Sequence, residues 1–185
     1  MPNTLATRLW PAATGSTGGK ILMVLAGTAL LTLSAKVQFP FWPVPMTMQT
    51  FVVLLIGVAY GARLGGATVL AYLAQGAVGL PVFAAGGGLA YLMGPTAGYL
   101  IGFLAAAVLV GLLAERGLCR TRLGTLATFL AGTAVIFALG AGWLAVLFGP
   151  EVALASGVLP FLLSEAFKIA LAVALVPLAW TLGRS

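Results

Sequence analysis

Residues 64–114 read LGGATVLAYLAQGAVGLPVFAAGGGLAYLMGPTAGYLIGFLAAAVLVGLLA, and none of them is charged. A helix that crosses a membrane needs about 20 predominantly apolar residues, with a range of roughly 17–25. This stretch is long enough for two such helices and the connection between them. It predicts a chain that folds within a lipid bilayer.

The composition of the whole chain supports this prediction. Of its 185 residues, 62% are hydrophobic and 6% are charged, and the mean hydropathy is +1.16. A soluble domain carries about 25% charged residues, so this chain could not cover a surface that faces water. We therefore expect an all-α integral membrane protein.

The residue inventory excludes most catalytic chemistry. The chain has no histidine and no aspartate, and its three acids are Glu115, Glu151 and Glu165. Cys119 is the single cysteine, which rules out an intrachain disulfide and a cysteine metal cluster. A nucleophile, base and acid close in sequence are also missing. We expect neither an enzyme nor a cofactor or metal site.

Six stretches are predicted to cross the membrane as one bundle. We expect a cytoplasmic N-terminal tail at 1–19 and a single transmembrane domain at 20–183. The second and third spans are short and separated by a few residues around Gly61, which favours a tight helical hairpin there. The predicted spans are 20–39, 46–62, 64–81, 94–114, 123–148 and 158–182.

The basic residues predict the orientation of this bundle. If six helices cross, seven of the nine Lys and Arg residues lie on one side: Arg8, Lys20, Arg63, Arg116, Arg120, Arg122 and Arg184. The excess of positive charge in cytoplasmic loops then places both termini in the cytoplasm. We expect the tail at 1–19 to be loose. A cleavable signal at the first span is a competing interpretation, although Leu33-Ser34-Ala35 is a poor cleavage site.

Small residues at a spacing of four predict close contacts between helices, since they let backbones approach one another in lipid. We expect these stripes to pack mainly inside the bundle, with contact to a separate membrane partner as the alternative. They are Gly94, Gly98, Gly102 and Ala106 in the fourth span, and Ala134, Ala138 and Gly142 in the fifth.

Glu165 and Lys168 are the most informative polar residues. They lie roughly 10–15 Å into the last span at 1.5 Å per residue, and their i,i+3 spacing places them on one helical face. Each charge alone would cost roughly 2.5–3.5 kcal/mol or more within the membrane, so such residues usually mark a ligand or ion path. The pair suits a polar, partly anionic small molecule or a proton relay. The alternative is a structural pair that only sets the helix rotation.

Two uncharged connections are predicted on the side toward which this pair opens. Residues 38–49 (QFPFWPVPMTMQ) hold three prolines, which prevent a helix, and we expect a stiff lid there. Thr47 and Gln49 add hydrogen-bonding groups at its end. Residues 79–95 (GLPVFAAGGGLAYLMGP) contain three consecutive glycines that allow close backbone approach to a ligand. Apolar walls with a few polar groups are typical of a small-molecule site.

The chain carries no recognisable ATPase motif. Residues 15–21 (GSTGGKI) resemble a phosphate-binding loop but lack the Ser or Thr after Lys20, and no strand precedes them. Ions or a partner would therefore have to supply the energy for any active transport.

Four blocks of sequence together resemble one known family. They are 43–50 (PVPMTMQT), 72–83 (YLAQGAVGLPVF), 94–103 (GPTAGYLIGF) and the pair Glu165 and Lys168. They are similar to the BioY family, the biotin-specific substrate-binding (S) components of energy-coupling-factor (ECF) vitamin transporters. The family usually has Asp where Glu165 stands.

This resemblance implies a six-helix protein of the bacterial cytoplasmic (inner) membrane that binds biotin from outside. It also implies a membrane-embedded ECF coupling subunit and cytoplasmic ECF ATPase subunits as partners, and no nucleic acid. Biotin would be a transported ligand. A stand-alone ion- or proton-coupled uptake carrier is the alternative, with Glu165 as its relay, and a non-transporting membrane scaffold fits the residues least well.

The resemblance also suggests roles for individual side chains. Biotin has an apolar bicyclic body, a urea group and a carboxylate tail. Glu165 would accept from the urea N–H groups, and Lys168 would donate to the urea oxygen or to the carboxylate. The expected walls are Phe83, Trp42 and Tyr91, with Thr47 and Gln49 as secondary polar contacts.

Overall fold

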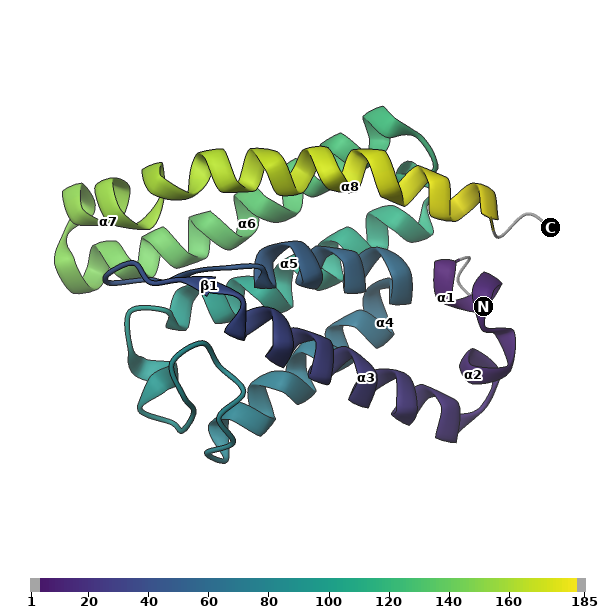
Figure 1. Cartoon of the computed structure of the whole chain (residues 1–185), viewed down its shortest axis with the longest axis horizontal. Helices are drawn as coiled ribbons and strands as arrows, with labels where there is room; N and C mark the ends of the chain where they lie inside the picture. The colour runs from purple at the N-terminus through teal and green to yellow at the C-terminus, as the bar shows by residue number, and fades with distance from the viewer. Residues whose placement is uncertain (1–3, 183–185) are drawn as a thin grey trace.

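The computed structural model describes residues 4–182, and these residues form a bundle of long helices (Figure 1). Residues 1–3 and 183–185 lie outside the described residues, and with them Arg184 of the predicted basic set. The helices are α1 (Leu5–Leu9), α2 (Pro11–Gly15), α3 (Thr17–Lys36), α4 (Gln49–Ala77), α5 (Ala97–Glu115), α6 (Arg122–Phe148), α7 (Pro150–Gly157) and α8 (Leu162–Leu182), with short 3-10 turns η1 (Tyr91–Met93), η2 (Leu118–Arg120) and η3 (Leu159–Phe161).

Five helical segments of the described chain are long and apolar enough to cross a membrane. They are α3, α4, α5, α6 and the stretch from Pro150 to Thr181 that includes α8. The prediction of an apolar helical bundle is confirmed, with one small addition. Residues 38–39 (β1) pair antiparallel with residues 46–47 (β2), so that Gln38 faces Thr47. The prolines between them prevent a helix, and the paired strands satisfy part of the backbone in its place.

The helix α4 reverses direction at Gly61 and contains both the second and the third predicted spans. Gly61 has φ 80° and ψ 177°, a backbone conformation that is essentially restricted to glycine. The two arms then run side by side. They are so close that a Cβ on Gly65 would lie 3.2 Å from Gly57 Cα. The side chain of Gln49, at the start of α4, donates to Tyr72 Oη in the second arm at 2.7 Å. The predicted helical hairpin is confirmed.

Glu115 stabilises this reversal, although it lies one residue beyond the predicted span 94–114. It is the last residue of α5, and its Oε1 accepts a hydrogen bond from the backbone N–H of Ala62 at 2.9 Å. Ala62 begins the second arm of α4, where backbone N–H groups have no partner within the helix. A carboxylate is also favoured at a helix N-terminus by the helix dipole. Glu115 therefore acts as a cap between two helices.

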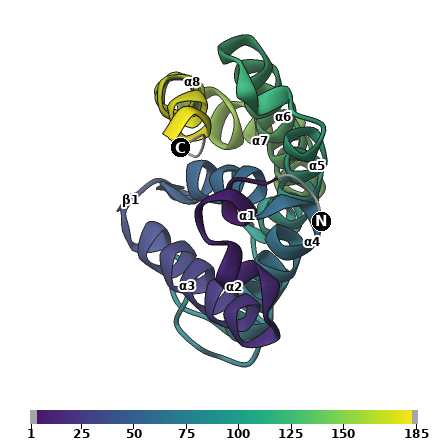
Figure 2. The same cartoon turned by 90° about the vertical axis from the view of Figure 1, so that its right-hand side faces the viewer.

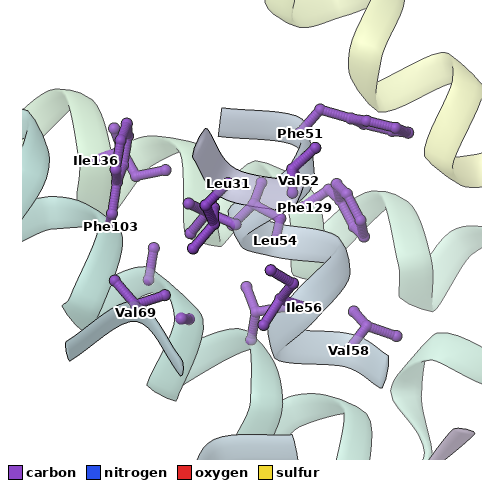
Figure 3. Close-up of a cluster of buried hydrophobic side chains, with 14 of the residues drawn as sticks. Leu31, Phe51, Val52, Leu54, Ile56, Val58, Val69, Phe103, Phe129 and Ile136 are labelled. Carbon is purple, nitrogen blue, oxygen red and sulfur yellow. The ribbon is translucent and has the colours of Figure 1, made fainter. Parts of the chain in front are cut away.

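The core lies where α4, α5 and α6 meet, with α3 packed on one side (Figure 3). Labelled side chains from all four helices converge there, among them Leu31 of α3, Leu54 of α4, Phe103 of α5 and Ile136 of α6. The helices α3 and α8 lie on opposite sides of α4 (Figures 1 and 2). The two arms of α4 are therefore the most enclosed part of the bundle.

Small residues explain how closely α5 and α6 approach. A Cβ on Gly102 would lie 3.0 Å from Ile136 Cα, and one on Gly98 would collide with the carbonyl oxygen of Leu139. The predicted packing is confirmed for Gly98, Gly102 and Ala106, whereas Gly94 precedes α5 and is only half-buried. The prediction for α6 was wrong, because Ala134, Ala138 and Gly142 do not belong to the buried face of that helix. The helix α6 is apolar on every face, so the sequence does not show which face points into the bundle.

The N-terminal segment is folded against the bundle and is not the loose tail we expected. The side chain of Thr4 caps α1, and Leu5 and Ala6 of this helix are buried. Arg8 lies over the ring of Trp180 at 5.1 Å from its centroid, and Arg120 lies at 5.4 Å from the same ring. Figure 2 shows α1 and α2 at one end of the molecule. Stacking on an aromatic face stabilises both cations.

We predict that Gly61→Ala destabilises the protein by about 1–3 kcal/mol, because a side chain is forced into a conformation that glycine adopts without strain. The added Cβ would also collide with the Glu115 carboxylate and the Thr4 side chain. The measurement is the unfolding midpoint of the purified protein in detergent. Gly142→Ala is the matched control, since its Cβ meets open space and should leave the midpoint unchanged or slightly raised. Equal midpoints for the two variants would contradict the role of Gly61.

Candidate ligand-binding site

A small cavity lies at the end of the bundle opposite Gly61. Its volume is about 40 Å³, and its walls come from the β1–β2 connection, the start of α4, the glycine-rich connection before α5, and the start of α8. The polar residues that line it are Thr47, Gln49, Thr50, Thr96, Glu165 and Lys168. The aromatic residues that line it are Phe83, Tyr91, Tyr99, Phe103, Phe137 and Phe161.

Glu165 and Lys168 form a buried ion pair in the first turns of α8. Lys168 Nζ lies 2.6 Å from Glu165 Oε1, and Lys168 and Glu165 are 7% and 4% exposed, respectively. Lys168 also donates to the backbone carbonyl of Thr47 at 2.7 Å and to Thr50 Oγ1 at 2.9 Å. An ammonium group has three N–H donors, so the described residues already supply an acceptor for each of them.

Thr50 connects the two charged groups. Its hydroxyl accepts from Lys168 and donates to Glu165 Oε1 at 2.8 Å. Oε1 therefore receives two hydrogen bonds, whereas no described residue donates one to Oε2. In this arrangement Oε2 is the acceptor that remains for a ligand.

A second hydrogen-bonded chain positions the connection after α4. Gln49 Nε2 donates to Tyr72 Oη at 2.7 Å, and Tyr72 Oη donates to the carbonyl oxygen of Val82 at 3.0 Å. Lys36 Nζ donates to the neighbouring carbonyl of Phe83 at 2.6 Å. Three separate segments thus hold residues 82 and 83 in place, and they set the position of the Phe83 side chain.

Phe83 is the central aromatic wall of the cavity. It is 1% exposed, and its ring stacks on Tyr91 with 4.9 Å between centroids and meets Tyr72 edge-on at 5.4 Å. Gly76 is required behind it, because a Cβ there would overlap the Phe83 ring. Offset and edge-to-face ring pairs of this kind give a rigid apolar surface.

The structure brings six of the seven predicted site residues to this one cavity. Thr47, Gln49, Phe83, Tyr91, Glu165 and Lys168 all line it. Trp42, which we expected as a wall, does not. It is 75% exposed and packs edge-on against Phe148 at 6.0 Å. Trp42 sits near the tip of the connection between β1 and β2, and Val44 and Pro45 line the cavity instead.

Sequence reasoning missed several residues of the cavity. Thr50 ends the quoted block 43–50 but carries no charge that would draw attention to it. Phe161 precedes Glu165 by four residues, and that spacing places both on one helical face, so it could have been found. Tyr99 lies inside the block 94–103, and its hydroxyl donates to the carbonyl of Gly157 at 2.7 Å. Phe137 had no signal of its own, because α6 is apolar on every side.

The cavity is narrow. At about 40 Å³ it is far smaller than the roughly 300–1,000 Å³ of ordinary small-molecule sites. A ligand with a ring system therefore enters only when the covering connections move. Gly86 and Gly88 have positive φ angles in the connection that carries Phe83, and glycine tolerates the backbone changes that such a movement needs.

The fold and the cavity together define a class of protein. Apolar spans show a multi-pass membrane protein, and an aromatic cavity with a buried carboxylate–ammonium pair is suited to hold a small polar solute. Residues 8–185 match the sequence model of the BioY family. The chain therefore belongs to the BioY family.

Individual relatives support this assignment. The chain is 39% identical over 155 residues to the probable biotin transporter BioY of Pyrococcus horikoshii, across 83% of this chain and 91% of the relative. It is 44% identical over 114 residues to the biotin transporter BioY of Thermotoga maritima, across 61% of this chain and 66% of the relative. A crystal structure of the S-component for biotin from an ECF-type ABC transporter superposes with a TM-score of 0.75 at 27% identity, covering 85% of this chain and 88% of that chain.

We predict strongly non-additive effects of substitutions in the buried pair. Lys168→Met or Glu165→Gln alone removes one partner, and breaking a buried pair in this way typically costs about 3–5 kcal/mol. The double variant removes both charges and should cost less than the sum of the two. The measurement is the free energy of unfolding of all four proteins in detergent. Additive losses within about 0.5 kcal/mol would show that the two residues are energetically independent.

Proposed function

We propose that this chain is the biotin-binding S component of an ECF-type vitamin uptake transporter. It captures biotin at the outer face of the membrane for import that partner subunits drive with ATP. The proposal rests on membership of the BioY family, on relatives described as biotin transporters, and on the likeness to a biotin S-component. It makes the chain a transport subunit rather than an enzyme.

The observation that carries the proposal is the unshared oxygen of Glu165. Biotin's urea group offers two N–H donors and one carbonyl acceptor. Glu165 Oε2 accepts no hydrogen bond from a described residue, so it can receive a urea N–H without breaking an existing contact. Lys168 already has three acceptors, and its hydrogen bond to Oε1 orients the carboxylate. A charge-assisted hydrogen bond in a dry site is stronger than a neutral one.

The walls of the cavity fit the rest of the ligand. Phe83 and Tyr91 form a stacked aromatic surface against which the apolar bicyclic body of biotin would pack. Thr47 donates to Gln49, and Gln49 donates to Tyr72, so both act as secondary polar contacts near the covering connection. Biotin itself is the transported ligand, and the proposal includes no cofactor.

We further propose six membrane crossings with both termini in the cytoplasm of a bacterial cell, in its inner membrane. The two arms of α4 would each cross. Thr50 in the first arm lines the cavity, and Ala62, just beyond the far end of that arm, bonds to Glu115 at the end of α5. The start of α5 also lines the cavity, through Tyr99, so this arm and α5 run between the same two levels. The positive charge at the Gly61 end then favours that end as cytoplasmic.

The partners in this proposal are a membrane-embedded ECF coupling subunit and cytoplasmic ECF ATPase subunits. The chain has no phosphate-binding loop of its own, so ATP hydrolysis would have to take place in another subunit. The surrounding lipid bilayer is the third partner, and no nucleic acid is involved.

We predict that Glu165→Ala and Lys168→Ala each weaken biotin binding at least tenfold, or by about 1.4 kcal/mol or more. The first removes the urea acceptor, and the second leaves a buried carboxylate without its counter-charge. Isothermal titration calorimetry on purified, folded variants measures the effect. Trp42→Ala is the control and should bind biotin as the unmodified protein does, because its ring lies outside the cavity. Unchanged affinity in both cavity variants would rule out this site.

We also predict that the chain alone, in vesicles with an imposed pH gradient, does not accumulate biotin. Accumulation should require the coupling subunit, the ATPase subunits and ATP, because the chain has no means of its own to hydrolyse ATP. The measurement is uptake of radiolabelled biotin into vesicles of matched protein content. Uptake driven by the pH gradient in the absence of ATPases would instead support a proton-coupled carrier that uses Glu165 as its relay.

A further inference from the structure

A second and larger cavity lies at the opposite end of the bundle, beneath the N-terminal helices. Its volume is about 430 Å³, which falls within the range of ordinary small-molecule sites. Thr4 reaches it from the N-cap of α1 and Thr14 from α2. Lys20 lies in the first turns of α3, Arg63 follows the reversal of α4, and Glu115 ends α5. The biotin site shares no residue with this cavity, so a ligand bound here does not depend on the proposed function.

The charged groups of this cavity have an excess of positive charge. Lys20 and Arg63 both line it, and among residues 4–182 neither side chain takes part in a hydrogen bond or an ion pair. Glu115 is the acid on the wall, but its Oε1 is occupied by the backbone N–H of Ala62. Two cations and one engaged carboxylate therefore face the same space. This arrangement attracts an anion.

Apart from the hydroxyls of Thr4, Thr7 and Thr14, the rest of the wall is apolar. The Tyr60 ring, Leu64 and Ala67 line it, and Tyr60 directs its hydroxyl to the carbonyl oxygen of Met23 at 3.2 Å. Ala67 is exposed on the second arm of α4, a segment that is apolar enough to face lipid. A small inorganic anion would leave most of this wall without a contact. The cavity therefore suits an amphiphile with an anionic head and an apolar chain.

Its position in the bundle identifies the kind of amphiphile. Lys20 lies near the start of α3, and Arg63 lies beside the reversal at Gly61, so both are at helix ends where lipid headgroups are found. Clusters of Lys and Arg at such positions recognise anionic lipids. The helices α1 and α2 cover the cavity, which hinders a folded protein partner, whereas Ala67 lies on its lipid side.

We propose that this cavity is a binding site for one anionic phospholipid. Lys20 and Arg63 bind the phosphodiester, and an acyl chain follows Leu64 and Ala67 along the second arm of α4. A bound lipid would join α1 and α2 to the reversal of α4 and so stabilise the N-terminal helices against the bundle.

The test is native mass spectrometry of delipidated protein in detergent, titrated with phosphatidylglycerol or phosphatidylcholine of the same acyl chains. We expect phosphatidylglycerol to bind about tenfold more tightly or better, and Lys20→Gln with Arg63→Gln to remove that preference. Arg116→Gln with Arg122→Gln is the matched control, since neither residue lines the cavity. It should keep the preference.

Two further measurements distinguish binding of the acyl chain from binding of the phosphate alone. Ala67→Trp fills the apolar wall without changing the charge, and it should weaken phosphatidylglycerol binding while an unchanged unfolding midpoint in detergent shows that the variant is folded. Inorganic phosphate at millimolar concentration should not displace the lipid. The proposal would be overturned by equal affinity for the two lipids, or by a variant of Lys20 and Arg63 that keeps the preference. It would also be overturned if phosphate alone displaced the lipid, or if a polyglutamate peptide bound more tightly than the lipid.

Discussion

The buried ammonium group of Lys168 connects the start of α8 to the start of α4. Lys168 donates to Glu165 in its own helix, and to Thr47 and Thr50 at the junction of β2 and α4. A charge in a membrane is tolerated only when it is paired and hydrogen-bonded. The start of α8 must therefore face the start of α4. That requirement places the connections before and after α4 over one cavity.

The same constraint explains why the site is small and still able to bind. Nearly every polar group around the cavity already has a partner, and the chain from Gln49 through Tyr72 to Val82 holds the aromatic wall in place. The unshared oxygen of Glu165 is an exception, as are the hydroxyls of Thr96 and Tyr91 among the described residues. A ligand with N–H donors satisfies it, and the interaction free energy offsets the cost of opening a cavity of about 40 Å³. Binding and loop movement are thereby coupled.

Much of this arrangement was predictable from local patterns. Each of these patterns lies within one helix or one turn. They are the long apolar stretches, the i,i+3 spacing of Glu165 and Lys168, and the glycine between two short spans. The failures concern contacts between segments. Trp42 resembled a wall but turned outward, and Glu115 resembled a loop residue but caps α4. The small residues of α6 were also predicted wrongly, because they lie off its buried face. In lipid an apolar face is stable whether or not another helix covers it.

By itself the sequence determined that the chain is a helical membrane protein, which charged pair lies within the bilayer, and to which family the chain belongs. Those conclusions follow from composition and short spacings, because burying an unpaired charge or an unbonded backbone in lipid is costly wherever it occurs. Only the tertiary structure decided that Thr50 bridges the pair, that Glu165 keeps one free oxygen, and that α1 and α2 cover a basic cavity. Each of these depends on atoms brought together from separate helices, and no local pattern specifies such a distance.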